Sequence, residues 1–273
     1  MIPAAFDYRR AATVDEALSL LADSGEDAKL LAGGHSLLPL MKLRLASPAV
    51  LIDLSRIRDL SYVTDAGDHL AIGALTRHRD VETSPIVAAE APLLALVAGQ
   101  VGDPQVRHRG TIGGSIAHGD PASDLPAAAL ALDATMIARG PSGERAIPAA
   151  EFFTGFLETA LRPDEVLTEI RVPKAAGATW GWQKFTRRAA DWAIVGVAAV
   201  RNGSTRVALV NMDSRPVRAT GVEDALRGGA SAADASRHAA DGLSPPSDLN
   251  GDAAYRTHLA AVLVARALDG AGG

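Results

Sequence analysis

Two short glycine-rich segments, each with two glycines followed by a serine, constrain this chain more than any other feature. Residues 31–36 read LAGGHS and residues 110–115 read GTIGGS; they are termed the first and the second glycine corner. Glycine reaches positive φ and has no Cβ, so successive N–H groups can point into one concavity. In the first corner Ser36 suits a helix N-cap, and Pro39 is tolerated in a first helical turn. Such a corner favours an anion, usually phosphate.

A single glycine corner is weak evidence for a phosphate site, because most such segments are only tight turns. Two corners with matching order on one chain favour a single extended diphosphate that is held from both sides. The residues before the first corner indicate how the chain reaches it. Residues 28–32 and 49–54 read as buried strands around a helix at 36–45, which is a βαβ unit whose first strand ends at the corner.

The composition excludes several classes of protein. The 273 residues carry a net charge of -5 without a sustained basic run, which argues against nucleic-acid binding. The absence of cysteine excludes disulfides, a thiol nucleophile and any iron–sulfur cluster held by this chain's own thiolates. No apolar stretch approaches 18 residues, so we expect no transmembrane segment and a cytoplasmic location.

The order of helix and strand signals predicts two domains with a boundary just after residues 174–177. Thr13 and Glu16 form a capping box, and Asp124 is expected to be the N-cap of a helix at 124–132. An Asn202-Gly203 turn predicts a hairpin. The remaining expected strands are 69–73, 136–138, 145–147, 166–172, 180–187, 193–201 and 205–212; the expected helices are 81–100, interrupted by two prolines, 220–226, 232–240 and 253–268.

Several motifs carry a resemblance to a known family. They are LAGGHSLLP from Leu31, GTIGGSIAH from Gly110, DPASDLP from Asp120, KFTRR from Lys184 followed by DWA, and YRTHL from Tyr255. In order and spacing the chain resembles the FAD-binding medium subunit of carbon monoxide dehydrogenase-type molybdenum hydroxylases, a chain type also found among xanthine dehydrogenase relatives. The resemblance spans essentially the whole chain. One departure is Gly119, where the family pattern has alanine or serine.

The resemblance implies an α+β fold with two domains. Residues 1–175 would form a two-lobed FAD-binding domain of the vanillyl-alcohol oxidase (PCMH) type, with lobes at about 1–56 and 57–175. Residues 176–273 would form a smaller C-terminal domain of a three-stranded antiparallel sheet and a three-helix bundle.

The resemblance also implies which residues bind FAD non-covalently. Both corners would hold the diphosphate mainly through backbone N–H groups, Asp124 would bond ribose hydroxyls of the nucleotide part, and Lys184 would lie near the flavin ring. There a cation stabilises negative charge on the reduced ring. The implied cofactor-binding residues are Ala32, Gly33, Gly34, His35, Ser36, Val101, Thr111, Ile112, Gly113, Gly114, Ser115, Asp124, Leu167 and Lys184. No residue is assigned a catalytic or metal-binding role.

Other interpretations of the same residues remain open. His35 could bind a metal, and so could the group His108, His118, Asp120 and Asp124, although their spacing fits no zinc pattern. Ser36 and Ser115 could be nucleophiles, but neither lies in a Gly-x-Ser-x-Gly elbow. Lys184 could be a solvated charge at a strand edge; an extended strand would place it on one face with Trp180 and Trp182.

The leading functional hypothesis is an electron-transfer subunit. By resemblance, a large partner subunit with a molybdopterin cofactor oxidises the substrate, and a small partner with [2Fe–2S] clusters passes electrons to FAD on this chain, in a dimer of heterotrimers. The external acceptor could be a quinone, oxygen or NAD, and the substrate stays open. The alternatives are a self-contained flavin oxidase or dehydrogenase and a nucleotide-binding assembly protein. Gly114→Val is expected to abolish FAD binding.

Overall fold

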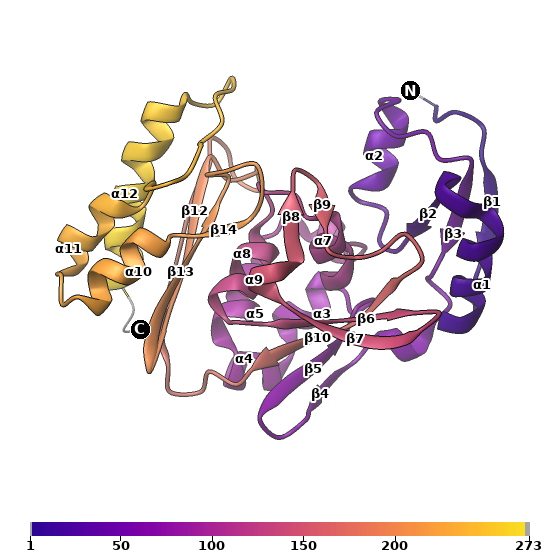
Figure 1. Ribbon diagram of the computed structural model, residues 1–273, viewed down its shortest axis with the longest axis horizontal. Helices are drawn as coiled ribbons and strands as arrows, with labels where there is room; N and C mark the ends of the chain where they lie inside the picture. Colours follow the sequence, from indigo (N-terminus) through magenta and orange to yellow (C-terminus); the bar gives the residue numbers. More distant parts are fainter. Residues whose placement is uncertain (1, 271–273) are drawn as a thin grey trace.

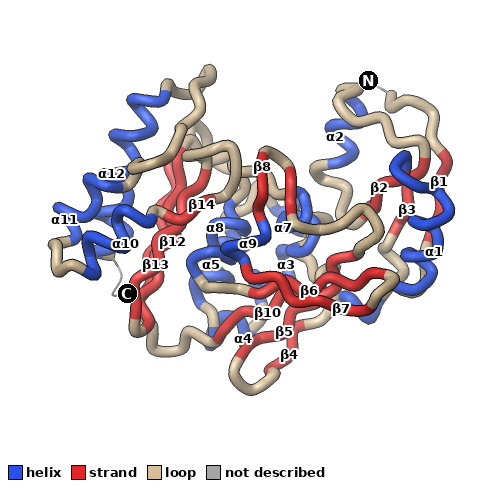
Figure 2. The backbone as a smooth tube through the Cα atoms, in the orientation of Figure 1, coloured by secondary structure: helices blue, strands red, loops and turns tan. Residues whose placement is uncertain are grey.

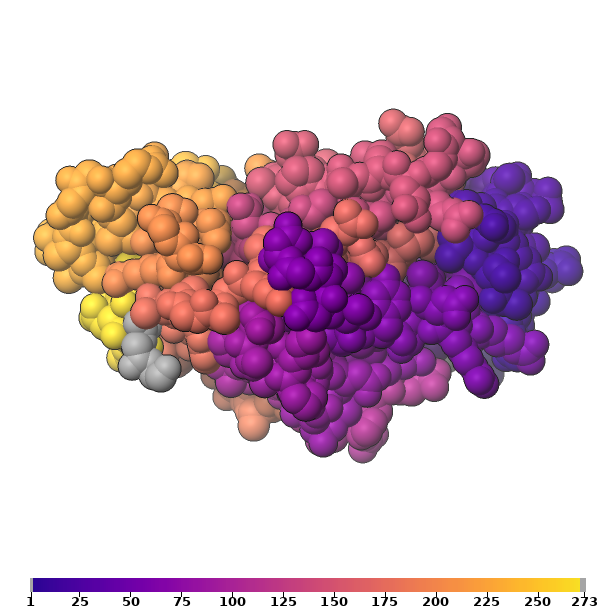
Figure 3. Space-filling view, turned by 90° about the horizontal axis from the view of Figure 1, so that it is seen from below, coloured from indigo at the N-terminus to yellow at the C-terminus, as the bar shows by residue number. Residues whose placement is uncertain are grey.

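The chain folds into three parts that follow one another along its long axis. A computed structural model describes residues 2–270. An N-terminal lobe and a C-terminal domain occupy opposite ends, with a middle lobe between them (Figure 1). The space-filling view shows the same order, from the indigo N-terminal lobe to the orange and yellow C-terminal domain (Figure 3). Among residues 2–270, no helix combines the length and the apolar character that crossing a bilayer requires.

The N-terminal lobe is a small parallel sheet with the predicted βαβ unit at its centre. Its strands are β1 (Asp7–Arg10), β2 (Ala28–Leu31) and β3 (Val50–Asp53), in the order β1-β3-β2. Two helices accompany them, α1 (Val14–Ser24) and α2 (Leu37–Lys42). The predicted pairing of β2 with β3 is confirmed. All four residues of β1 are exposed, so this edge strand lacks the apolar alternation that would have predicted it.

The predicted capping box at the start of α1 is present. Thr13 Oγ1 accepts a hydrogen bond of 3.1 Å from Glu16 N, and Glu16 Oε2 accepts one of 2.7 Å from Ala12 N. The reciprocal bond therefore reaches Ala12, one residue before the N-cap. Both bonds satisfy donors that a helix start leaves unpaired.

The middle lobe is a five-stranded antiparallel sheet covered by helices. The strand order is β4 (Val63–Asp65), β5 (His69–Gly73), β10 (Val166–Pro173), β6 (Thr135–Gly140) and β7 (Gly143–Pro148). The region expected to be helical with interruptions is three helices, α3 (His78–Thr83), α4 (Pro85–Glu90) and α5 (Pro92–Gly99). Prolines begin two of them, where the missing N–H has no intrahelical partner to lose.

Two further helices of the middle lobe place predicted site residues. Helix α7 (Ile112–His118) starts in the second glycine corner, and α8 (Asp124–Ala131) is buried along its whole length. Asp124 is the first residue of α8, so its predicted N-cap role is wrong; Ser123 holds that position. Gly119 ends α7 with φ 65°, a left-handed conformation that glycine adopts without strain, which accounts for glycine there.

The C-terminal domain packs three helices on one face of an antiparallel sheet (Figure 2). The predicted strands are β11 (Thr179–Phe185), β12 (Val195–Asn202) and β13 (Ser204–Val210); a two-residue strand β14 (Val217–Arg218) adds a fourth. The helices are α10 (Thr220–Arg227), α11 (Ala232–Ala235) and α12 (Ala253–Asp269). The remaining helices and strands are α6 (Pro104–Arg107), α9 (Ala149–Phe152), β8 (Phe153–Gly155), β9 (Glu158–Thr159) and the 3-10 turns Gly25–Asp27, Arg58–Leu60 and Ser236–His238.

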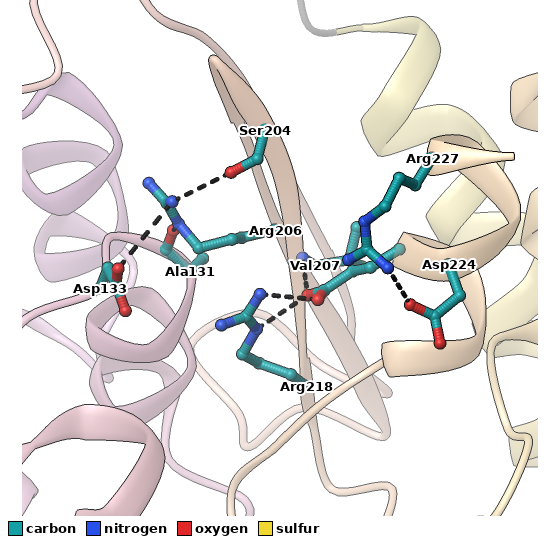
Figure 4. Close-up of polar contacts among 9 residues, drawn as sticks. Ala131, Asp133, Ser204, Arg206, Val207, Arg218, Asp224 and Arg227 are labelled. Atoms are coloured by element: carbon teal, nitrogen blue, oxygen red, sulfur yellow. Dashed lines mark hydrogen bonds and ion pairs between the residues drawn. The ribbon is translucent and has the colours of Figure 1, made fainter. Parts of the chain in front are cut away.

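Polar contacts hold the C-terminal domain against the middle lobe (Figure 4). Arg206 on β13 donates through Nε to Ala131 O at 3.0 Å, and its Nη1 lies 3.9 Å from Asp133 Oδ2, just beyond α8. On the other side of the sheet, the buried Glu223 accepts from Val207 N at 2.9 Å and pairs with Arg218 at 2.6 Å. The sheet is thus tied both to its own helices and to the helix that begins at Asp124.

Candidate functional site

A large cavity lies where the three parts meet. It has a volume of about 1010 Å³, at the upper end of the range for small-molecule sites. Both glycine corners, residues 154–167 of the middle lobe and residues 184–192 of the C-terminal domain contribute to its walls. All the predicted cofactor-binding residues except Ile112 line it.

The first corner supplies a row of unpaired backbone donors. It follows β2 directly, and Gly34 adopts φ 80°, which the sequence of two glycines permits. Within residues 2–270, the N–H groups of residues 33–37 have no acceptor. Ser36 occupies the predicted N-cap position of α2, but its side chain makes no capping bond. Five successive N–H groups and one hydroxyl are therefore left for a ligand.

The second corner differs, because its backbone donors are already used within the chain. Ile112 N donates to Thr76 O at 3.0 Å and Gly113 N to Ala74 O at 2.9 Å. The next two N–H groups, those of Gly114 and Ser115, donate to Thr111 Oγ1 and Thr111 O, both at 3.1 Å. The expectation that residues 111–115 hold a diphosphate stays a prediction, and their N–H groups from 112 to 115 already have acceptors within the chain. Ile112 in particular is 1% exposed and belongs to the core.

Close packing explains the glycines of the second corner. A Cβ on Gly113 would lie 2.6 Å from Ala74 O, and one on Gly114 would lie 2.6 Å from Thr111 Oγ1. The corners also touch each other, since a Cβ on Gly33 would lie 2.3 Å from Arg109 O. Gly114→Val would therefore displace the Thr111 cap of α7, so the substitution tests the helix as well as the cavity.

A buried ion pair joins the middle lobe to the C-terminal domain in the cavity wall. Lys184 Nζ on β11 lies 2.6 Å from Asp124 Oδ2, and both side chains are more than nine-tenths buried. Lys184 also donates to Gln100 O at 3.0 Å. Asp124 Oδ1 is buried without a partner, and burial raises the pKa of this carboxyl to about 6, against the opposing effect of Lys184. The interpretation of Lys184 as a solvated strand-edge charge is wrong.

Neighbouring residues fix the position of Lys184. Trp182 Nε1 donates to Gln100 Oε1 at 2.9 Å, so Trp182 and Lys184 both contact Gln100 from the face that the strand pattern predicted. Trp180 packs against the hydrophobic core cluster that contains Trp182. Val101 follows Gln100, and Leu167 lies on β10 beside an irregularity in its pairing with β6. Both line the cavity.

Sequence reasoning missed His78 and Trp192, among other residues of the cavity wall. His78, the first residue of α3, is 3% exposed, and its Nε2 lies 3.3 Å from Ser115 Oγ. Burial lowers its pKa to about 4, and its Nδ1 has no partner. Nothing in the sequence around His78 pointed to this position. Trp192, 58% exposed and in the cavity wall, lay within a motif that carried the resemblance but was not selected.

The histidines and acids considered as metal ligands do not converge. His118 Nε2 lies 3.9 Å from Asp120 Oδ2, while Asp124 faces Lys184. Within the described part of the chain, no group of three or more His, Cys, Asp or Glu side chains is arranged to hold a metal ion. His35 lines the cavity, and burial and nearby arginines lower its pKa.

Comparison with known families divides the chain in two. Residues 4–175 match the FAD binding domain in molybdopterin dehydrogenase, and residues 180–271 match the CO dehydrogenase flavoprotein C-terminal domain. The chain belongs to the FAD-binding medium subunits of the molybdenum hydroxylases. Members of this family are subunits of oxidoreductase complexes, and the domain that carries both glycine corners is their FAD-binding domain.

Full-length relatives support the assignment to this family. The carbon monoxide dehydrogenase medium chain of Hydrogenophaga pseudoflava is 46% identical, with 99% of this chain and 98% of the relative covered. Subunit alpha of the 6-hydroxypseudooxynicotine dehydrogenase complex of Paenarthrobacter nicotinovorans is 37% identical, with 98% and 95% covered. A solved structure of carbon monoxide dehydrogenase from H. pseudoflava that lacks the Mo-pyranopterin moiety matches with a TM-score of 0.94, 48% identity, and 99% and 98% coverage.

Proposed function

We propose that this chain takes electrons from the [2Fe–2S] clusters of a small partner subunit and passes them through FAD to an external acceptor. The observation that supports this best is the convergence, in one cavity, of the unpaired N–H groups of residues 33–37 and the buried pair of Asp124 and Lys184. The first feature suits a diphosphate. The second suits the flavin half of FAD, where a cation stabilises negative charge on the ring.

The residues of the cavity fit FAD in a specific way. The first corner would hold the diphosphate, with Ser36 and Ser115 offering hydroxyls beside it. Asp124 Oδ1, buried without a partner, fits a ligand hydroxyl, because an unpaired buried carboxylate oxygen gains from such a donor. FAD would supply a redox group that can accept two electrons one at a time.

The ion pair revises one assignment. Asp124 and Lys184 lie 2.6 Å apart, so they face the same part of a bound molecule. If Lys184 faces the flavin ring, Asp124 faces the ribityl hydroxyls of the flavin half and not the ribose of the adenosine half. Lys184 then holds its ammonium beside the ring, fixed by Asp124 and Gln100. Val101 and Leu167 exclude water from this end of the cavity.

The proposed partners follow from the family. The relatives are named as the medium chain of carbon monoxide dehydrogenase and as a subunit of a nicotine-derivative dehydrogenase complex. We infer a small [2Fe–2S] subunit and a large molybdopterin subunit for this chain, in a cytoplasmic dimer of heterotrimers. Since relatives named for different substrates share this subunit type, the substrate is selected elsewhere in the complex.

The deciding experiment is a titration of the purified full chain with FAD, followed by absorption and by mass analysis of the released cofactor. We expect one non-covalent FAD per chain. Lys184→Met should lower the midpoint potential of the bound flavin, and Lys184→Arg should restore it in part. Lys174→Met is the matched control, because Lys174 pairs with Asp65 at 2.7 Å on the middle lobe and does not line the cavity.

Two results would overturn the proposal. One is the absence of FAD binding both by the isolated chain and by the chain co-expressed with its neighbouring subunits. The other is a tagged chain that binds FAD but purifies without iron and molybdenum, which would favour a self-contained flavoprotein. Co-purified iron–sulfur clusters that reduce the flavin in rapid mixing would support electron transfer.

A further inference from the structure

We propose that Asn211 is a positioning residue that fixes the loop carrying Trp192 against the turn that leads to Asp124. The inference rests on the proposed function, because both segments line the cavity assigned to the flavin. Asn211 lies just beyond the end of β13, outside every motif that the sequence singled out. It lines no part of the cavity itself, so it acts through the residues that it holds.

Asn211 contacts both segments at once. Its backbone N donates to Pro121 O at 2.7 Å, and its side-chain Nδ2 donates to Ala193 O at 3.0 Å. Pro121 is buried in the turn of residues 119–123, three residues before Asp124. Ala193 directly follows Trp192 and is 2% exposed. One residue of the C-terminal sheet thus joins the two segments that carry Asp124 and Trp192.

The loop that Asn211 holds has few other anchors. Residues 186–192 are half-buried or exposed, and Ala190 adopts φ 60°, which is unusual for a residue with a side chain. A hydrogen bond of 2.8 Å from Ile194 N to Phe185 O joins the two ends of the loop. The two carbonyls after Trp192 both accept from side chains: Ala193 O from Asn211, and Ile194 O from the fully buried Arg256. Without Asn211, Arg256 would supply the only side-chain hydrogen bond to these two carbonyls within residues 2–270.

The residue type fits this role. Asn211 adopts φ 62°, and asparagine tolerates this left-handed conformation better than most residues. Its amide supplies the donor that the buried Ala193 carbonyl needs, and a buried carbonyl without a donor is costly. Glycine at this position would keep the backbone conformation and the bond to Pro121, and would remove only the contact with Ala193.

Asn211→Gly is therefore the test, made in the full-length chain loaded with FAD. We expect one FAD per chain with about fivefold weaker affinity, the equivalent of one hydrogen bond, and stronger quenching of the bound flavin's fluorescence by iodide. Asn202→Gly is the matched control, because Asn202 is exposed in the hairpin turn at the opposite end of β13. It should change neither quantity.

Non-additivity separates positioning from general destabilisation. If Asn211 acts through Trp192, Asn211→Gly should not increase iodide quenching further in a Trp192→Ala background. Equal quenching and affinity in Asn211→Gly and the parent chain would overturn the proposal. So would additive effects with Trp192→Ala, or loss of folding in both Asn211→Gly and Asn211→Asp, since the residue would then serve the fold. Failure of the parent chain to bind FAD would instead overturn the proposed function.

Discussion

The two glycine corners share a Gly-Gly pair followed by a serine, but their backbone N–H groups are used differently. The first leaves the N–H groups of residues 33–37 unpaired, and the second donates those of residues 112–115 to acceptors within the chain. The difference lies in the surroundings. Both corners border the cavity, but the backbone of the second is also packed onto Ala74 and Thr76. Similar motifs therefore differ in how many backbone donors they leave free, according to what packs behind them.

The largest expected effect tests the structural role of the second corner. Gly113→Val should lower the free energy of unfolding by roughly 4 kcal/mol or more, because the new side chain would meet the backbone of Ala74. Urea denaturation of the chain without FAD would measure it. Gly34→Ala, at φ 80° against the flexible Leu38 side chain, should cost only about 1–2 kcal/mol. Equal losses in the two variants would contradict the distinction between the corners.

His78, which contacts Ser115 of the second corner, should make the free energy of unfolding depend on pH. The pKa of His78 falls from 6.5 to about 4 on folding, so its contribution is complete above pH 6.5 and is lost as the pH falls towards 4. The loss amounts to about 3 kcal/mol. His78→Gln should remove this slope from stability curves measured by denaturation between pH 7 and 4. An unchanged slope in the variant would show that other groups cause it.

A third prediction concerns the Asp124 side chain, which lines the cavity after the second corner. Asp124→Asn should weaken FAD binding about thirtyfold at pH 7.5, since a hydrogen bond to a charged group is lost. A ligand hydroxyl favours the ionised carboxylate, whose pKa is about 6, so the parent chain should lose affinity as the pH falls below 6. In the variant this dependence should vanish. Fluorescence titration at several pH values provides the measurement.

The smallest expected effect comes from a comparison of the N-cap residues of α7 and α2, Thr111 and Ser36. Thr111 Oγ1 accepts a bond from Gly114 N, whereas Ser36 makes no capping bond. Thr111→Val should cost about 1 kcal/mol of stability without FAD, and Ser36→Ala should cost less than about 0.5 kcal/mol. If Ser36→Ala proves as costly as Thr111→Val, the first corner depends on its cap in solution. Thermal unfolding of the two variants side by side is sufficient.

Local patterns predicted much of the architecture. The βαβ unit around the first corner, the capping box at Thr13 and the Asn202-Gly203 hairpin each depend on residues close in sequence, and each is present. Strands β1 and β14 are among those that the patterns missed, because one is exposed on both faces and the other has only two residues. Neither leaves an apolar alternation for a pattern to detect.

The site was harder to predict, because its decisive contacts join distant residues. Two acceptors of the second corner, Ala74 O and Thr76 O, precede it by more than thirty residues. Sixty residues separate Asp124 from Lys184. Resemblance indicated that both of these residues matter, but their direct contact required the fold. His78 and Asn211 lie outside the motifs and act through Ser115 and Ala193.

The residues that line the cavity are synthesised at different times. The first corner leaves the ribosome about 150 residues before Lys184, which at 5–20 residues per second corresponds to roughly 8–30 s. During that interval the nascent chain presents its unpaired N–H groups without the lysine that completes the site. The cavity wall is therefore incomplete until Lys184 has been synthesised.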